Sequence, residues 1–168
     1  MKYYLYDLHV ALNMDNISEK ENDFNDKQLQ QNIARYQEIY KTLSDRLPSD
    51  VYQHFHSWGF HDYHLTKMEL EHKSLVDLSV HFTLSSDVEN KDQEKKWLLS
   101  FNKVSFYHFQ HHNYDNEQSI FHKEIDNWLY QEFLPIDNAT LSFEVLFESG
   151  ANILLHFPSN FVAIKRIK

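Results

Sequence analysis

The longest regular pattern of apolar and polar positions in the chain covers residues 75–84. Apolar side chains alternate there with polar ones, at Val76, Leu78, Val80, Phe82 and Leu84. A period of two over this length is typical of a β-strand with one buried and one solvated face. Residues 63–71 form a second extended run, separated from the first by His72 and Lys73. The pattern therefore predicts an antiparallel hairpin with its turn at His72 and Lys73.

The segment before this hairpin has a helical period instead. Apolar residues recur there at spacings of three and four, at Leu29, Ile33, Tyr36, Tyr40, Leu43 and Leu47. This spacing places them on one face of a helix. We expect Asn25 to cap that helix and Pro48 to end it. A second, short helix is predicted over residues 49–58, with Trp58 turned inward and Gly59 at its end.

Alternation returns in the remainder of the chain. It predicts further strands at residues 97–106, 124–133, 141–147, 153–157 and 161–167. A change of parity at Asn102 and Lys103 indicates a bulge in the first of these strands. Residues 108–119 show no apolar period, which predicts a polar loop.

Together these elements predict an α+β fold. Helices at the N-terminus pack on a mostly antiparallel β-sheet of six or seven strands. We expect one domain over residues 1–168, with a helical part at 1–59 and an antiparallel β part at 60–168.

Composition and charge narrow the classes of function. The chain has no cysteine, which excludes disulfides, Cys-based zinc sites and thiol catalysis and allows a reducing compartment. The formal net charge of −9 disfavours nucleic-acid binding, because phosphate contacts need clustered Lys and Arg. It favours a basic protein partner. The sequence shows neither a secretory signal nor an apolar run of roughly 18 residues, so we expect a cytoplasmic protein without membrane contact.

Short motifs along the chain resemble those of a family of small bacterial proteins of unknown function. The matching residues are Met1 to Tyr3, Leu47-Pro48, Phe60-His61-Asp62, Phe101 to Val104, and Trp128, Tyr130 and Glu132. The resemblance implies an α+β layout and no established activity. More loosely, the chain is similar to some immunity proteins of bacterial toxin systems, which are also small, acidic and free of catalytic motifs.

Five residues near the hairpin are candidates for chemistry. His54, His56, His61 and His64 are of the type that binds zinc, and Asp62 follows one of them. On a helix, however, His54 and His56 point about 200° apart. Solvated or hydrogen-bonded histidines are therefore the simpler interpretation of the four. The pair His61-Asp62 suits acid–base catalysis, or alternatively a structural role at the entry to the strand.

The predicted strand 124–133 carries a candidate binding surface. Trp128, Tyr130 and Glu132 share one face by their spacing of two. If that face is exposed, they form an aromatic recognition patch, and if it is buried they belong to the core.

Two hypotheses of function remain open from the sequence, together with a third possibility, small-ligand binding between helices and sheet, which the sequence does not separate from the first. The first is a non-catalytic protein-interaction domain, with an immunity-like role as one version of it, binding through Trp128, Tyr130 and Glu132. The alternative is a metal-dependent or His/Asp acid–base enzyme centred on residues 54–64. Nothing in the sequence predicts a cofactor. A free edge of the sheet also offers a route to homo-oligomers.

Overall fold

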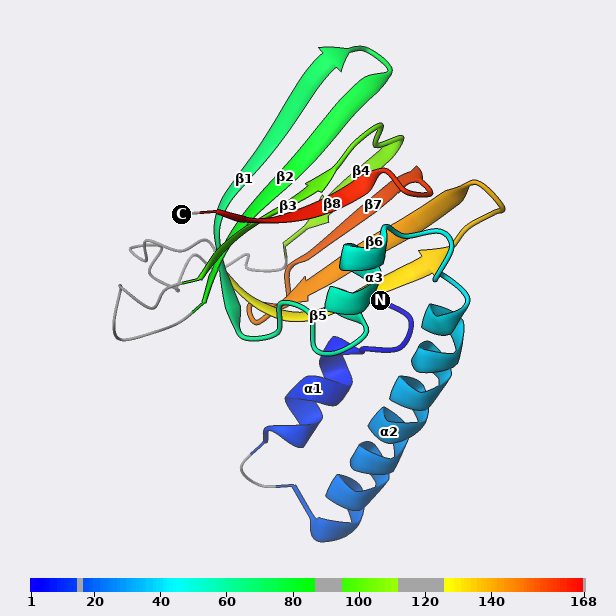
Figure 1. Cartoon of the computed structure of the whole chain (residues 1–168). Coiled ribbons are helices and arrows are strands. Elements are labelled where there is room, and N and C mark those ends of the chain that lie inside the picture. Colours follow the sequence, from blue (N-terminus) through cyan, green and yellow to red (C-terminus); the bar gives the residue numbers. More distant parts are fainter. Residues whose placement is uncertain (15–16, 87–94, 112–125, 168) are drawn as a thin grey trace.

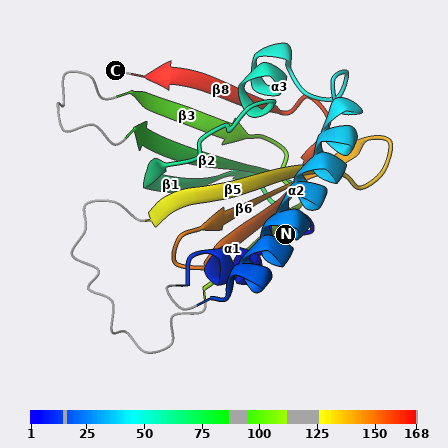
Figure 2. The same cartoon turned by 90° about the horizontal axis from the view of Figure 1, so that it is seen from below.

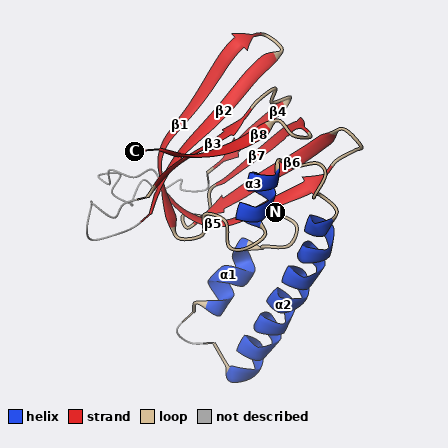
Figure 3. Cartoon of the chain, viewed as in Figure 1, coloured by secondary structure: helices blue, strands red, loops and turns tan. Residues whose placement is uncertain are grey.

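The computed structural model describes residues 1–14, 17–86, 95–111 and 126–167, and it has the predicted α+β architecture (Figures 1 and 3). The helices of this described part are α1 (Tyr6–Leu12), α2 (Glu19–Lys41) and α3 (Ser49–Phe55). Its strands are β1 (Tyr63–Ser74), β2 (Asp77–Ser86), β3 (Lys96–Phe101), β4 (Phe106–Gln110), β5 (Asp126–Pro135), β6 (Thr140–Phe147), β7 (Asn152–Pro158) and β8 (Val162–Ile167). The described residues thus form eight strands, rather than six or seven.

All eight strands belong to one antiparallel sheet with the order β4-β7-β6-β5-β1-β2-β3-β8. The pairing of β1 with β5 is short and consists of His64 opposite Asn127 and Leu65 opposite Asp126. This seam joins two halves of four strands each, and Figure 2 shows β1 and β5 side by side at the junction. A short seam allows the two halves to bend toward each other.

The core lies between these two halves and consists largely of phenylalanine rings. The Phe101 ring of β3 lies 4.7 Å from that of Phe143 on β6 and 4.9 Å from that of Phe157 on β7, measured between centroids. Phe55 of α3 reaches the same cluster and lies 5.0 Å from Phe133. Burial of large aromatic side chains is the main stabilising contribution in such a core.

Helix α2 begins earlier than its apolar stripe predicts. Ser18, rather than Asn25, is the cap residue, and it forms a capping box with Glu21. The first buried side chain of α2 is Tyr36, and the residues before it are exposed or half-buried. The predicted start was wrong because hydrophobic periodicity detects only the part of a helix that packs. No helix in the described ranges is long and apolar enough to cross a membrane.

The β1–β2 hairpin is longer than predicted and extends away from the rest of the sheet (Figure 1). Ser74 pairs with Asp77, so Leu75 and Val76 form the turn, rather than His72 and Lys73. These two turn residues are 97% and 88% exposed. The prediction failed here because Val76 continues the alternation of the strand, so the pattern counted the turn residues as part of the strand.

The sequence predicted one strand over residues 97–106 with a bulge at Asn102 and Lys103, but the structure has two separate strands there. The chain leaves β3 after Phe101, passes Lys103 in a left-handed conformation with φ 52°, and enters β4 as a separate strand. β4 pairs with β7 in the other half of the sheet. It includes His108, where a loop was expected; residues 112–119 of that predicted loop lie outside the described ranges.

Candidate functional site

A column of stacked rings crosses the junction of the N-terminal segment, β5 and the loop between α3 and β1. Tyr4 stacks on Tyr130 with ring centroids 4.9 Å apart, and Tyr130 stacks on His61 at 5.4 Å. His61 lies 5.1 Å from Trp58, whose residue surface is 63% exposed. We call these four residues the aromatic column. Its Trp58 end is open to solvent, which corrects the prediction that Trp58 is turned inward.

A bulge in β5 determines which side chains join the column. The pairing with β6 shifts between Trp128 and Tyr130, so Leu129 is the extra residue. The His61 Nδ1 contacts the Leu129 carbonyl oxygen. Because a carbonyl only accepts, this nitrogen carries the hydrogen, and Nε2 is left to face the Asp62 carboxylate. The bulge thus orients the His61 ring on Tyr130.

The same bulge separates the predicted binding residues. Trp128 is 1% exposed and packs in the core, with its ring 6.0 Å from those of Phe82 and Phe143. Tyr130 is half-buried and Glu132 fully buried, and both contact the N-terminal segment instead. The expected shared face of Trp128, Tyr130 and Glu132 therefore does not form. A bulge inverts the assignment of faces beyond it.

Buried Trp128 still supports the column through Gln131. The Trp128 indole Nε1 donates to Gln131 Oε1 at 2.6 Å, and Gln131 Nε2 donates to the Trp58 carbonyl oxygen at 3.2 Å. Gly59, with φ +61°, allows the loop to approach this closely, because an added Cβ would lie 2.8 Å from Gln131 Nε2. Buried Trp128 and Gln131 thereby fix the backbone at Trp58, whose side chain is exposed.

Glu132 anchors the other end of the column. Its carboxylate accepts hydrogen bonds from the backbone N–H groups of Lys2, Tyr3 and Tyr4 at 2.9, 2.6 and 2.7 Å. Glu144, which lies opposite Glu132 on β6, accepts from the Met1 amino group at 2.7 Å. These contacts place the Tyr4 ring on Tyr130. Neither role was evident from the sequence, because the partners are far apart along the chain.

The tyrosine hydroxyls of the site are neutral, and its negative charge is that of the Asp62 carboxylate. Burial, with the nearby Glu132 and Tyr130, raises the pKa of Tyr4 to about 12. Burial and the Asp62 carboxylate raise the pKa of Tyr130. Burial also lowers the pKa of His9, whose ring lies 5.8 Å from Tyr130. The Asp62 side chain is 88% exposed, so its charge faces solvent beside the column.

The His61 ring and the Asp62 carboxylate lie next to each other at the entry to β1. The distance from His61 Nε2 to Asp62 Oδ1 is 3.5 Å. Asp62 adopts a left-handed conformation with φ 64°, and its backbone N–H donates to the Trp128 carbonyl oxygen at 3.1 Å. This bond supports the structural role at the strand entry.

The four candidate metal ligands lie in different surroundings. His54 packs on Phe60, whereas His56 lies near Tyr52. His61 belongs to the aromatic column, and the His64 Nδ1 contacts the side-chain oxygen of an asparagine on β5. No group of three or more metal-binding side chains in the described ranges is placed to hold an ion. The geometry therefore lends no support to the metal-dependent alternative.

Together the fold and the site define an α+β protein with an open aromatic and acidic surface. Comparisons with protein families, with curated proteins and with solved structures find no match for this chain. The family resemblance in its motifs stays a prediction, and the functional argument rests on geometry and charge.

Proposed function

We propose that the protein is a non-catalytic interaction domain that binds a basic protein partner at the open end of the aromatic column. The observation that carries this proposal is that exposed Trp58 and exposed Asp62 both lie next to His61. An indole face attracts a cation, and a carboxylate adds a hydrogen-bond acceptor. An arginine guanidinium uses both at once.

The charge of the chain supports the same class of partner. A net charge of −9 attracts a basic protein over a distance and accelerates association. Tryptophan, tyrosine and arginine dominate binding energy at protein interfaces. An immunity-like role, in which the acidic protein covers a basic toxin, is a specific version of this proposal.

The contribution of each group to binding is modest. A cation–π contact at an exposed site contributes about 0.5–1 kcal/mol, and an exposed ion pair about 0.2–1 kcal/mol. Loss of the cation–π contact therefore weakens binding of a simple probe about two- to fivefold, and loss of the ion pair about 1.4- to fivefold. A protein partner adds further contacts around this anchor.

The test is an NMR titration with a hexa-arginine peptide, followed through the tryptophan indole N–H signals. We expect the Trp58 signal to move while that of buried Trp128 stays, because Trp128 donates to Gln131 inside the core. Asp62→Asn should weaken binding, and the matched surface change Asp45→Asn should not. An unmoved Trp58 signal, an equal response to hexa-glutamate, or an equal effect of the two variants would refute the proposal.

A further inference from the structure

Strand β4 lies at one end of the sheet, where β7 is its only partner strand among the described residues. The other edge of its backbone therefore has no strand beside it in this part of the chain. None of the five side chains of β4, from Phe106 to Gln110, carries a carboxylate, ammonium or guanidinium group. Four of the five are exposed, with Phe106 at 42% and Phe109 at 49%. β4 is thus an aromatic and uncharged edge strand.

The other edges without a partner strand in the described ranges carry charged side chains. β8, at the opposite end of the sheet, exposes Lys165 and Arg166. Beyond its short pairing with β5, strand β1 carries four charged side chains, at Lys67, Glu69, Glu71 and Lys73. Charged residues, proline and bulges are the usual devices that keep an edge strand from pairing with another chain. β4 has none of them, and it pairs with β7 without a shift of register.

The neutrality of this end of the sheet indicates which partner it fits. Strand β7, the neighbour of β4, likewise contains no Asp, Glu, Lys or Arg. Charge therefore gives a basic partner no advantage at this edge, and at the contact itself it does not oppose a second copy of the same acidic chain. Phe106 and Phe109 lie on opposite faces of β4, because their spacing along the strand is odd. A strand added at this edge would cover both rings.

Contacts within the chain already hold two of the aromatic side chains of β4. The Phe106 ring stacks on that of His156, which lies opposite it on β7, with centroids 4.6 Å apart. On the other face, the Tyr107 hydroxyl donates to Met68 Sδ at 3.7 Å. Side chains that are ordered before association lose less entropy when a partner binds. The edge is therefore prepared for a second strand.

We propose that two copies of the chain pair through β4 in an antiparallel, symmetric arrangement that joins their sheets into one. A symmetric dimer needs a self-complementary surface. The register that pairs all five residues is centred on His108, which then faces His108 of the second copy. In this register Tyr107 faces Phe109 of the second copy, and this aromatic pair, of a kind that stabilises antiparallel sheets, occurs twice. The inference concerns another surface and another partner than the proposed function and does not rest on it.

The test substitutes His108 in the full chain, because this side chain is exposed and the symmetry places its two copies directly opposite each other. His108→Lys and His108→Glu each bring two like charges together at the centre of the interface. Each variant alone should therefore dimerise at least about tenfold more weakly than the unchanged chain. An equimolar mixture of the two variants brings opposite charges together, so dimers should form again. Native mass spectrometry with one variant isotope-labelled identifies dimers that contain one copy of each.

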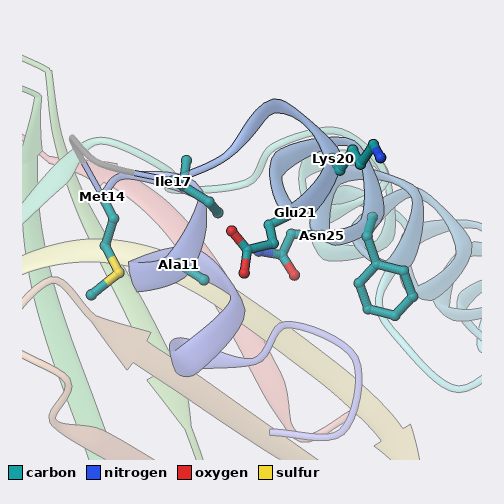
Figure 4. A pocket seen from close by; sticks show the side chains of 7 residues that line it. Ala11, Met14, Ile17, Lys20, Glu21 and Asn25 are labelled. Carbon is teal, nitrogen blue, oxygen red and sulfur yellow. The ribbon is translucent and has the colours of Figure 1, made fainter.

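Met14→Lys and Met14→Glu are the matched controls. Met14 is 60% exposed and lies in an open groove between α1 and α2, which is a different apolar surface (Figure 4). These variants add the same charges as the His108 variants, and they should dimerise as the unchanged chain does. Weakening of the dimer by the Met14 variants equal to that by the His108 variants would overturn the inference. Circular dichroism and thermal unfolding verify that each variant is folded.

Amide exchange of residues 106–110 gives an independent measurement. We expect it to slow as the protein concentration rises, because N–H groups at the edge of β4 then bond to the second copy. In His108→Lys it should not depend on concentration. Raising the salt concentration from about 50 to 500 mM should strengthen the dimer, because salt screens the repulsion between two chains of net charge −9.

An unchanged chain that stays monomeric at every concentration would overturn the inference, as would a mixture of His108→Lys and His108→Glu that forms no dimer. Exchange of residues 106–110 that is slow at every concentration would overturn it too, because another part of the same chain would then cover the edge. A dimer that salt dissociates would also contradict it, since charge would then hold the copies together. None of these results bears on the titration of Trp58, so the proposed function stands or falls separately.

Discussion

Replacing Glu132 with glutamine tests whether one buried carboxylate holds the N-terminal segment on β5. The Glu132 side chain is fully buried and accepts three backbone hydrogen bonds from Lys2, Tyr3 and Tyr4. Tyr4, in this segment, stacks on Tyr130. Glutamine keeps the size of the side chain and removes its charge, so the change acts on these hydrogen bonds with little effect on packing.

The structure sets the expected magnitude. Glu132 Oε1 accepts from Tyr3 and Tyr4, and Oε2 accepts from Lys2. In Glu132→Gln the amide group takes one oxygen position and cannot accept, so at least one buried N–H loses its partner, at a cost of about 1–3 kcal/mol. The remaining bonds lose their charge assistance, while the cost of burying a carboxylate disappears. We expect the free energy of unfolding to fall by about 1–3 kcal/mol.

Urea unfolding at pH 7, followed by tryptophan fluorescence, measures this change. Glu69→Gln is the matched control, because the Glu69 side chain is 52% exposed and pairs with Lys67 at the surface. That control should stay within about 0.5 kcal/mol of the unchanged chain. Amide exchange of residues 2–4 should accelerate only in Glu132→Gln. A loss below about 0.5 kcal/mol, or unchanged exchange, would refute the anchoring role of Glu132.

The pH dependence of the same pair of proteins gives a second result. Burial raises the pKa of Glu132 above its usual 4.5, although the three backbone amides and the N-terminal ammonium act against this. The folded state therefore takes up a proton before the unfolded state as the pH falls toward 4.5, which stabilises the fold. Glutamine has no such uptake, so the stability difference between the two proteins should widen from pH 7 to pH 5. A difference that narrows would show that the amides outweigh burial.

Three further substitutions test other parts of the structure. Gly59→Ala should lower the free energy of unfolding by about 2–3 kcal/mol, because φ is +61° and an added Cβ meets Gln131; a loss under about 1 kcal/mol in thermal unfolding would contradict this. His54→Leu should raise it by about 1 kcal/mol, since the buried Nε2 has no hydrogen-bond partner in the described part. Burial lowers the pKa of His54, so the advantage in urea unfolding should grow from pH 7.5 to 5.5; a less stable variant would contradict it. Leu75→Ser/Val76→Ser should change stability by less than about 0.5 kcal/mol, because both side chains are exposed; a larger loss in urea would reveal a contact at the hairpin tip.

The apolar pattern predicted the helices and strands well where they pack on the core. Tyr36, Tyr40, Leu43 and Leu47 of the predicted helical stripe are all buried, although α2 itself ends at Lys41. The clean alternation at residues 141–147 became β6, and that at 153–157 became β7. The pattern failed where side chains are mostly exposed, as in the first turns of α2. The motif Ser18-Glu19-Lys20-Glu21 was the available signal there, since it has the form of a capping box.

The candidate site was only partly predictable. The sequence identified His61, Asp62 and Tyr130 as candidates. The structure places His61 next to both of the others. Trp58 was assigned to the interior, because an aromatic residue at helical spacing is usually buried. Its exposure follows from the end of α3 at Phe55, three residues earlier. The loop that begins there turns the indole outward.

By itself the sequence determined the class of fold, the positions of most strands and the acidic character of the surface. These features do not depend on tertiary contacts, because the alternation of side chains along a strand and the net charge can be read from the sequence directly. The tertiary structure alone decided which faces are covered. A one-residue bulge at Leu129 separated Trp128 from Tyr130, and Glu132 met the Lys2 amide from 130 positions away. Exposure depends on what packs against a side chain, and distant segments of the chain supply those partners.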